Sequence, residues 1–506
     1  MQPTCDQRIS KGSGRRLTRL AAWIAAVLFV CLGLGLAQGS RAQTAQKHAD
    51  SGIRKQRMIV LTDIGAEADD TESTVRLLLY SDVIDIKGLI ATTSIWKRTS
   101  VSPELIDQVI RAYAKVHPNL VKHDPNYPTA EALEAVLKRG WPQYGMSGVG
   151  DGKDSEGSDW IIKNLEQNDD RPLWITVWGG ANTLAQALYK LRATKPPAEV
   201  DRLVAKLRVY TISDQDDSGP WMRKNFPNLF YIVSPGGLYD DATWTGIMAV
   251  VPGIDNSMIG NKWLAEHIQQ GHGPMGEAYP DVAWGMEGDT PSWLALIPNG
   301  LGDPEHPEWG GWGGRYELYR PEIHVNDPRT FLGGVPIPQE TRPIWTNALD
   351  DYAPPTYPEY GRTTRNGTKP IHDYKATLWR WRDDFQNDFA ARMEWTTKSY
   401  REANHPPVPI LDTPEAFTVK SGQSFRLSAH ATDPDGDSVS YLWFQYPEAG
   451  SYKGRVLVPL VENLNFNDFV APKVDKPETI HFILRVTDKG TPPLTRYKRV
   501  IVTVTP

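Results

Sequence analysis

Short apolar runs alternate with amphipathic stretches between residues 55 and 300 of the chain. Runs such as "RMIVLTD" have the length of buried strands, whereas "DTESTVRLLLYSD" places its apolar residues on one face of a helix. This alternation predicts an α/β domain with a mostly parallel sheet and flanking helices. The predicted strands are 57–63, 84–93, 172–180, 207–217 and 228–237, and the predicted helices are 70–82, 102–117 and 182–194.

The pattern changes after residue 300. Residues 301–372 are rich in Gly, Pro and Trp and predict irregular structure. Residues 373–401 then predict one long helix, because their apolar residues recur at helical spacing. We expect these residues to be core or docking contacts: Leu378, Trp381, Phe385, Phe389 and Met393.

The last part of the chain has the period of β-strands. A Pro-rich stretch, "EANHPPVPILDTP", precedes runs such as "TIHFILRVTD" that alternate apolar and polar residues between turns. They predict a small β-sandwich of immunoglobulin or fibronectin type. Within it, "DPDGD" (Asp433–Asp437) reads better as a tight turn than as a calcium loop. The predicted domains are a leader at 1–42, an α/β domain at 43–402 and a sandwich at 403–506.

The N-terminal residues are typical of a secretory signal peptide. A basic stretch precedes the apolar run 20–37, and small residues near Ala42 offer a cleavage point. The alternative is an uncleaved membrane anchor, because the run could just span a bilayer. Cys5 and Cys31 are the only cysteines, so a cleaved protein has neither a disulfide nor a thiolate metal site. We therefore expect a periplasmic or secreted protein, held by its core and free of the membrane.

The net charge and the aromatic content restrict the kinds of ligand that we expect this protein to bind. The leader carries six Lys or Arg and one acid, so its removal changes the net charge from −6 to −11. An acidic chain is a poor nucleic-acid binder. With 18 Trp, it suits neutral sugars, whose C–H faces stack on aromatic rings. The sequence leaves the oligomeric state open.

An unusual concentration of acids follows the first predicted strand. Asp63 ends the strand, Gly65 permits a tight bend, and Asp69 and Asp70 begin the helix. Capping of the helix by Asp69 or Asp70 is the plain interpretation. Capping explains one acid but not the whole cluster, which also fits a polyol or a hard cation such as calcium.

The stretch "TDIGAEADD" resembles the N-terminal aspartate motif of the nucleoside hydrolases. The chain is most similar to their exported relatives, cellulose-binding proteins with a nucleoside-hydrolase-like domain and a C-terminal sandwich. Further motifs that carry this resemblance are "TTSIW", "WGGANTLAQAL", "ISDQDDSGPW", "HGPMG", "EGDTPSWLALIPNGL" and "WRWRDDFQNDFAARMEW".

The resemblance implies a calcium site and a reaction. It assigns calcium to Asp63, Asp70 and Asp289 and to a backbone carbonyl at Asn182, and it assigns sugar hydroxyls to Asp69. In the family, an Asp matching Asp63 deprotonates a water that attacks the anomeric carbon. This chemistry suits the residues, since a carboxylate base assists water activation and surrounding carboxylates stabilise an oxocarbenium-like transition state.

Two departures put nucleoside cleavage in doubt. The acidic motif is two residues longer than in ordinary nucleoside hydrolases. Gly288 stands where those enzymes often have a His that protonates the leaving base. The first hypothesis is therefore an exported calcium-dependent glycosidase that acts on a glycan or glycoside and binds carbohydrate. The alternatives are a non-catalytic carbohydrate-binding protein on a hydrolase scaffold and a true nucleoside hydrolase.

Several other residues are candidates for sugar contacts. They lie at a predicted strand end, in a Gly-rich loop, beside Asp289, or in "EWGGWGG", whose tryptophans lack helical or strand periodicity. For each, a structural role is the competing interpretation. The candidates are Asp214, Asp216, Asp217, His272, Glu287, Trp309 and Trp312.

Overall fold

The structure is a computed structural model. It describes residues 54–235, 239, 242–252, 254–322, 338–352, 370–458 and 463–506. The predicted leader lies outside these ranges. Among the described helices, none combines the length and the apolar character that a membrane crossing requires.

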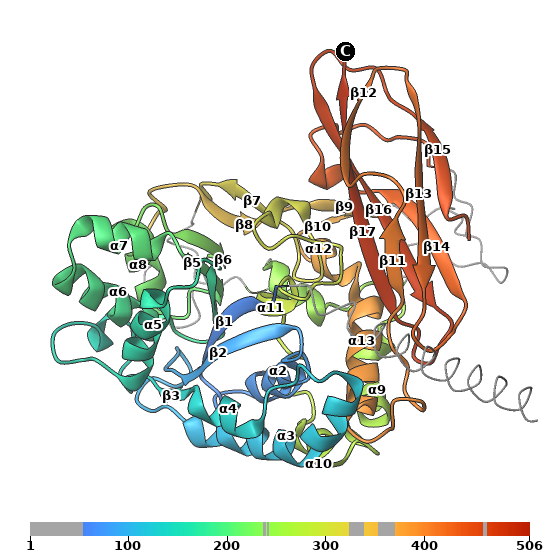
Figure 1. Cartoon of the computed structure of the whole chain (residues 1–506). Helices are drawn as coiled ribbons and strands as arrows, with labels where there is room; N and C mark the ends of the chain where they lie inside the picture. Colours follow the sequence, from blue (N-terminus) through green and yellow to red (C-terminus); the bar gives the residue numbers. More distant parts are fainter. Residues whose placement is uncertain are drawn as a thin grey trace, which may run out of the picture. The chain divides into compact units, whose positions relative to one another are not determined.

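The first domain is built on an eight-stranded sheet with the order β3-β2-β1-β4-β5-β6-β8-β7 (Figure 1). All neighbouring strands are parallel except the β7–β8 pair. The predicted mostly parallel α/β sheet is therefore confirmed. The strands are β1 (Gln56–Thr62), β2 (Ile84–Ala91), β3 (Leu137–Arg139), β4 (Leu173–Val177), β5 (Leu207–Ser213), β6 (Phe230–Ser234), β7 (Tyr316–Tyr319) and β8 (Ile344–Asn347).

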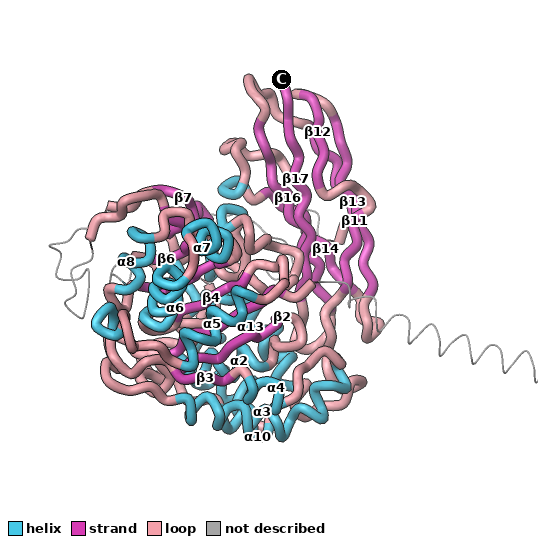
Figure 2. The backbone as a smooth tube through the Cα atoms, turned by 60° about the vertical axis from the view of Figure 1, so that its left-hand side comes forward, coloured by secondary structure: helices cyan, strands magenta, loops and turns pink. Residues whose placement is uncertain are grey.

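Helices cover both faces of this sheet (Figure 2). Alternate residues of β1 enter two separate hydrophobic clusters: Met58 and Val60 pack with α2 and α3, whereas Ile59 and Leu61 pack with α5 to α7. A strand buried on both faces must be apolar throughout, which explains the unbroken run in β1. These helices are α2 (Asp69–Leu78), α3 (Pro103–His123), α4 (Ala130–Ala135), α5 (Glu156–Glu166), α6 (Asn182–Thr194), α7 (Pro197–Val204) and α8 (Ser218–Asn225).

The stretch predicted as irregular contains strands, and the long predicted helix is broken. β7 and β8 extend the sheet, and two short strands pair beside it. The break falls at Trp381, whose backbone amide donates to the Leu378 carbonyl in a tighter turn. All five predicted contact residues of this segment are buried. The elements are η1 (Gly145–Gly148), η3 (Thr243–Ile247), η4 (Ser257–Ile259), α9 (Asn261–Leu264), η5 (Ala265–Gln269), α10 (Gly273–Ala278), α11 (Pro291–Leu294), η6 (Pro307–Trp309), β9 (Asp350–Tyr352), β10 (Ile371–Asp373), α12 (Ala376–Trp379) and α13 (Arg382–Glu394).

The C-terminal domain consists of two sheets, β11-β13-β15 and β12-β17-β16-β14, with antiparallel pairing except between β12 and β17. At the "DPDGD" turn, Asp433 Oδ1 accepts from the amides of Asp435 and Asp437, and Gly436 has φ +84°. These are the contacts of a tight turn. The strands are β11 (Val408–Leu411), β12 (Ala416–Lys420), β13 (Ser424–Thr432), β14 (Val439–Gln445), β15 (Phe466–Val470), β16 (Glu478–Asp488) and β17 (Thr495–Thr505), with the short helix η7 (Pro447–Ala449).

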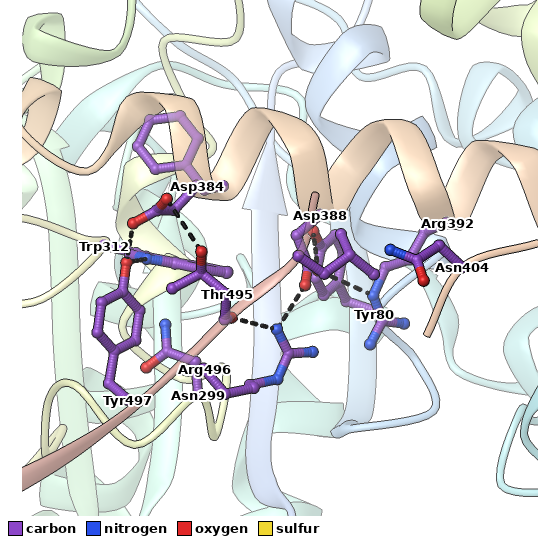
Figure 3. Close-up of polar contacts among 12 residues, drawn as sticks. Tyr80, Asn299, Trp312, Asp384, Asp388, Arg392, Asn404, Thr495, Arg496 and Tyr497 are labelled. Atoms are coloured by element: carbon purple, nitrogen blue, oxygen red, sulfur yellow. Dashed lines mark hydrogen bonds and ion pairs between the residues drawn. The ribbon is translucent and has the colours of Figure 1, made fainter. Parts of the chain in front are cut away.

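Helix α13 joins the two domains through buried carboxylates (Figure 3). Asp384 accepts from the Tyr497 hydroxyl, and Asp388 accepts from Arg496 at 2.6 Å. Asp388 also accepts from the Tyr80 hydroxyl, just beyond α2, at 2.8 Å. Because buried carboxylates need such partners, the sandwich is part of the structural support of the first domain.

Candidate functional site

The site lies at the carboxyl ends of the parallel strands, where α/β sheets bind their ligands. Asp63 directly follows β1, and Gly65 turns the chain toward α2 with φ +88°, a conformation that favours glycine. Gly179, just beyond β4, packs on the Asp63 side chain: a Cβ there would lie 2.5 Å from Asp63 Oδ1. The sheet therefore fixes Asp63 between two strand ends.

Four aspartates form what we call the acidic pocket: Asp63, Asp69, Asp70 and Asp289. Carboxylate oxygens of Asp69, Asp70 and Asp289 lie within 4.8 Å of one another. Asp289 Oδ2 is buried and has no hydrogen-bond partner. The structure thus brings together residues separated by more than two hundred positions in the sequence.

The capping interpretation is wrong for both acids of α2. The N-cap is Ala68, and no side chain caps this helix. Asp69 and Asp70 lie inside the first turn, where the helix dipole favours them. Asp70 also accepts from the Thr62 hydroxyl, and its amide donates to Asp69 Oδ1 at 3.2 Å.

Burial raises the pKa of every acid in the pocket, and repulsion by neighbouring acids raises it further for Asp69, Asp70 and Asp289. Burial raises the pKa of Asp69 to about 7, with further contributions from Glu67 and Asp63. Burial, followed by the charges of neighbouring pocket acids, raises the pKa of Asp70 and of Asp289. Burial also raises the pKa of Asp63, which Ser94 and Lys97 partly offset. The fold therefore holds close together several acids whose ionisation is unfavourable.

The acidic pocket fits a divalent cation. Calcium prefers several oxygen ligands, and the pocket offers carboxylate oxygens, one of them without a partner. A cation would also remove the repulsion that raises these pKa values. The residues that would hold it are Asp69, Asp70 and Asp289, with Asp63 at the edge.

The side chain of Asn182 has internal partners. Its side-chain amide donates to the Gln143 carbonyl at 2.7 Å, and its Oδ1 accepts from the Thr92 hydroxyl at 2.9 Å. As the first residue of α6, its backbone carbonyl points along the helix toward the amide four residues later. Its side chain links the loops that follow β2, β3 and β4, and the role of its backbone carbonyl as a calcium ligand stays a prediction.

Trp244 occupies the space beside Gly288. A Cβ on Gly288 would lie 2.9 Å from Asp69 Oδ2 and 2.9 Å from the Trp244 ring. The Trp244 indole nitrogen donates to Ser213 Oγ at 3.2 Å, which fixes the ring. A His at this position has no room without displacement of Trp244, so the Gly is a requirement of packing.

Glu287 is a structural residue rather than an acid/base candidate. It is fully buried, pairs with Arg76 at 2.8 Å and accepts from the Tyr279 hydroxyl at 2.7 Å. Its backbone amide donates to Glu72 at 2.8 Å. Burial and then the Glu287 charge raise the pKa of Glu72 to about 9. These contacts tie the loop before Asp289 to α2, which carries Asp69 and Asp70.

The three acids after β5 have separate internal partners. Asp214 forms a bidentate pair with Arg223 at 2.8 and 2.9 Å. Asp217 accepts from the Met146 amide at 2.7 Å. Asp216 accepts from Ser218 through Oδ1, while its buried Oδ2 lies against Gly180 without a partner. Asp214 and Asp217 are therefore corrected to structural residues, whereas Asp216 is buried against Gly180.

We expect Asp214→Ala to lower the free energy of unfolding by about 3 kcal/mol, because it leaves the buried Arg223 guanidinium with one carboxylate fewer. Denaturant-induced unfolding measures this effect. The matched control is Asp154→Ala, which removes a surface partner of Lys190 and costs less than about 1 kcal/mol. Unchanged stability together with weakened sugar binding would instead restore Asp214 as a ligand.

The remaining candidates lie outside the acidic pocket. His272, at the start of α10, packs near Glu394 and accepts from Thr396 through its carbonyl. Trp312 is 1% exposed, so it offers no stacking face. Trp309 stacks on His306 with centroids 4.0 Å apart and contacts His481 of the sandwich edge-on. Trp312 is therefore corrected to a packing contact, whereas the half-buried Trp309 packs on two histidines and its sugar contact stays a prediction.

Sequence reasoning missed residues on two loops that border the pocket. Ser94, after β2, hydrogen-bonds to Asp63, and Lys97 donates to the Ile64 carbonyl at 2.7 Å. The signal was present, because "TTSIW" follows a predicted strand at the same sheet edge. Trp244 gave no such signal, since it belongs to the short helix η3.

The fold and its acidic pocket define a nucleoside-hydrolase-like α/β protein with an added sandwich. Residues 57–316 match the family model "Cellulose-binding Sde182, nucleoside hydrolase-like domain". Residues 424–504 match "Cellulose-binding protein Sde0182, C-terminal domain". The chain therefore belongs to this family, as its motifs predicted.

Solved structures agree with this assignment. A nucleoside hydrolase-related protein from Saccharophagus degradans, described as associated with carbohydrate metabolism, is 34% identical with a TM-score of 0.73. The match covers 89% of this chain and 100% of that chain. The effector protein XOO4466 is 10% identical with a TM-score of 0.35, covering 71% of this chain and 99% of that one, and supports no inference. No curated protein matches the chain.

Proposed function

We propose that the chain is an exported calcium-dependent glycosidase that binds a glycan or glycoside in the acidic pocket. The observation that carries this proposal is the convergence of Asp69, Asp70 and Asp289, with an unpartnered buried oxygen, beside Asp63. The cellulose-binding description of the family supports a carbohydrate ligand. The nucleoside-hydrolase-like scaffold supports a hydrolytic reaction.

In this proposal Asp63 is the general base. Its carboxylate accepts a proton from the water that attacks the anomeric carbon, and the glycosidic bond breaks as the leaving group takes the electron pair. Burial makes Asp63 a stronger base, and Gly179 and Ser94 hold its orientation. Asp69, at the open side of the pocket, accepts hydrogen bonds from sugar hydroxyls. A bound calcium ion would acidify the water and orient the sugar.

The second candidate is a non-catalytic carbohydrate-binding protein. It is favoured by one observation: Trp244 fills the space beside Gly288, where a leaving-group acid would stand. The same observation argues against a true nucleoside hydrolase, in which the purine or pyrimidine base must be protonated as it leaves. Both alternatives keep the calcium site and the sugar ligand.

One assay separates the three functions. The purified protein is incubated in calcium or in EDTA with cellulose, cello-oligosaccharides, aryl glycosides and inosine, and released sugar, aglycone or free base is measured. Calcium-dependent release of sugar or aglycone is expected. Retention on cellulose with no release supports the binding protein, and release of hypoxanthine supports the nucleoside hydrolase.

Export is tested by expression of the chain together with its leader. Expression with the leader in a bacterial host is expected to give a protein shortened near Ala42, found outside the cytoplasm. Intact mass of the purified chain measures the cleavage. A full-length chain recovered with the membrane fraction would support the anchor instead.

A further inference from the structure

Among the tryptophans that the structure describes, two are exposed: Trp96, at 46%, and Trp284, at 95%. Large exposed aromatic side chains often mark binding surfaces. Each of these two belongs to a loop that also contributes to the acidic pocket. Trp96 follows Ser94, which bonds to Asp63, and Trp284 precedes Asp289 by five residues.

Trp96 is held at the rim of the pocket by its own loop. Ser94 Oγ accepts from the amides of Trp96 and Lys97 at 3.0 and 3.1 Å, and the Ser94 amide donates back to the Lys97 carbonyl at 3.1 Å. The same hydroxyl bonds to Asp63. The backbone that carries the indole is therefore ordered one short turn away from the proposed base.

Tyr239, Trp244 and Met248 each pack near one of the two tryptophan loops. Tyr239 hydrogen-bonds to the Trp96 side chain, and it stacks edge-on against Trp244 at 5.3 Å. Trp244 packs against Gly288, next to Asp69 Oδ2. Met248 packs so closely on Gly285 that a Cβ there would overlap its sulfur. Tyr239 thus contacts Trp96, and Met248 contacts Gly285, the residue after Trp284.

The backbone of Trp284 is strained, and its side chain is exposed to solvent. Its φ of +72° is unusual for a bulky residue, and an isolated bridge between Ala283 and Gly285 makes the bend tight. Such strain persists where the surrounding structure enforces it, and it clusters at ligand-binding sites. Packing does not explain the tryptophan, because the ring is almost wholly exposed.

The sandwich offers no comparable surface. Within its described residues, every aromatic side chain is buried or half-buried. The net charge of −6 and the acids of the pocket also disfavour an anionic polymer. Hence a stacking surface for neutral sugars is found on the first domain.

We propose that Trp96 and Trp284 are stacking platforms for a neutral glucan chain that runs across the acidic pocket. The inference rests on the proposed function, because it takes the pocket as the site of one sugar unit. It adds that neighbouring units of the same chain lie on the two indole rings. The ligand is then an extended oligosaccharide rather than a nucleoside or a monosaccharide.

Calorimetric titration with cellohexaose and cellobiose, in calcium, tests the two platforms in the whole protein. Wild type is expected to bind the hexaose more tightly, and Trp96→Ala and Trp284→Ala each to weaken hexaose binding about tenfold. Trp284→Phe should retain most of the affinity. Trp284→Gly should lose affinity while its Tm equals or exceeds that of wild type, since glycine accepts this φ.

The control is Tyr319→Ala, which removes an exposed aromatic residue of β7 and should leave binding unchanged. Wild-type affinity in both alanine variants overturns the inference, as does equal binding of polygalacturonate. Sugar release is measured separately on the same samples. Hexaose binding without hydrolysis would defeat the proposed glycosidase activity yet leave the platforms supported.

Discussion

Asp63→Asn is expected to lower kcat by about 10³-fold on any glycoside that the wild-type protein hydrolyses, with KM nearly unchanged. The amide keeps the shape of the carboxylate and still fits against Gly179, but it accepts no proton from water. Initial rates at saturating calcium measure the loss. Because the change is isosteric at a buried side chain and removes one repelling charge, the variant should unfold at a temperature no lower than that of wild type.

Two variants make this result interpretable. Ser94→Ala removes the hydrogen bond that orients Asp63 and should lower kcat by a smaller factor, about tenfold. Asp154→Asn changes a surface carboxylate paired with Lys190 and should leave the rate unchanged. A rate for Asp63→Asn equal to wild type would remove Asp63 from the reaction and favour the binding protein.

Much of the fold follows from periodicity in the sequence. The runs that became β1, β2, β4, β5 and β6 are rich in apolar residues, as buried parallel strands require, and those of β1, β2 and β4 are each followed by a helical pattern. The short strands β7 and β8 were missed because their four residues each are too few for a period to be recognised. The long predicted helix kept its apolar spacing while its backbone broke at Trp381.

The site was less predictable than the fold. A strand-end acid such as Asp63 is recognisable because chain order alone places it at the ligand edge. Asp214 and Glu287 had equally suggestive positions, but their roles depend on Arg223 and Arg76, which the sequence does not place beside them. A carboxylate becomes a ligand or a structural partner according to which cation folds against it. The tryptophans follow the same logic: only tertiary packing distinguished the buried Trp312 from the exposed Trp284.

The acidic pocket implies a conflict between stability and function. Folding buries Asp70 and Asp289 against each other and against Asp69, although burial and repulsion oppose their ionisation. The rest of the domain must offset this cost, and α2 and the residues after it are bound to α13 by hydrogen bonds from Arg76 to the Phe385 carbonyl and from Arg392 to the Leu79 carbonyl. A ligand that neutralises the pocket should therefore stabilise the whole fold, and removal of one pocket acid should do so as well.

Asp289→Asn is expected to raise the Tm of the calcium-free protein at pH 7.5 while it abolishes the response to calcium. In wild type, calcium at a hundredfold excess over its Kd should raise Tm by about 3 °C. The variant loses this rise because it lacks one of the carboxylates that would hold calcium. It gains stability in the absence of calcium because one of the repelling negative charges is gone. Differential scanning calorimetry in EDTA and in calcium measures both effects, with Asp154→Asn as the control that follows wild type.

The same acids give the calcium-free protein a characteristic pH dependence. The pKa of Asp69 is about 7 in the folded protein and 3.8 ordinarily, so the folded state binds more protons between these values. Stability is then greater at low pH and is lost as the pH rises through 7. Wild-type Tm in EDTA should fall between pH 5.5 and pH 8 on the order of a few degrees, and calcium or Asp289→Asn should flatten the change. If calcium-free wild type and Asp289→Asn follow the same pH curve and calcium shifts neither, the acids do not interact as a cation site, and the proposed reaction loses its centre.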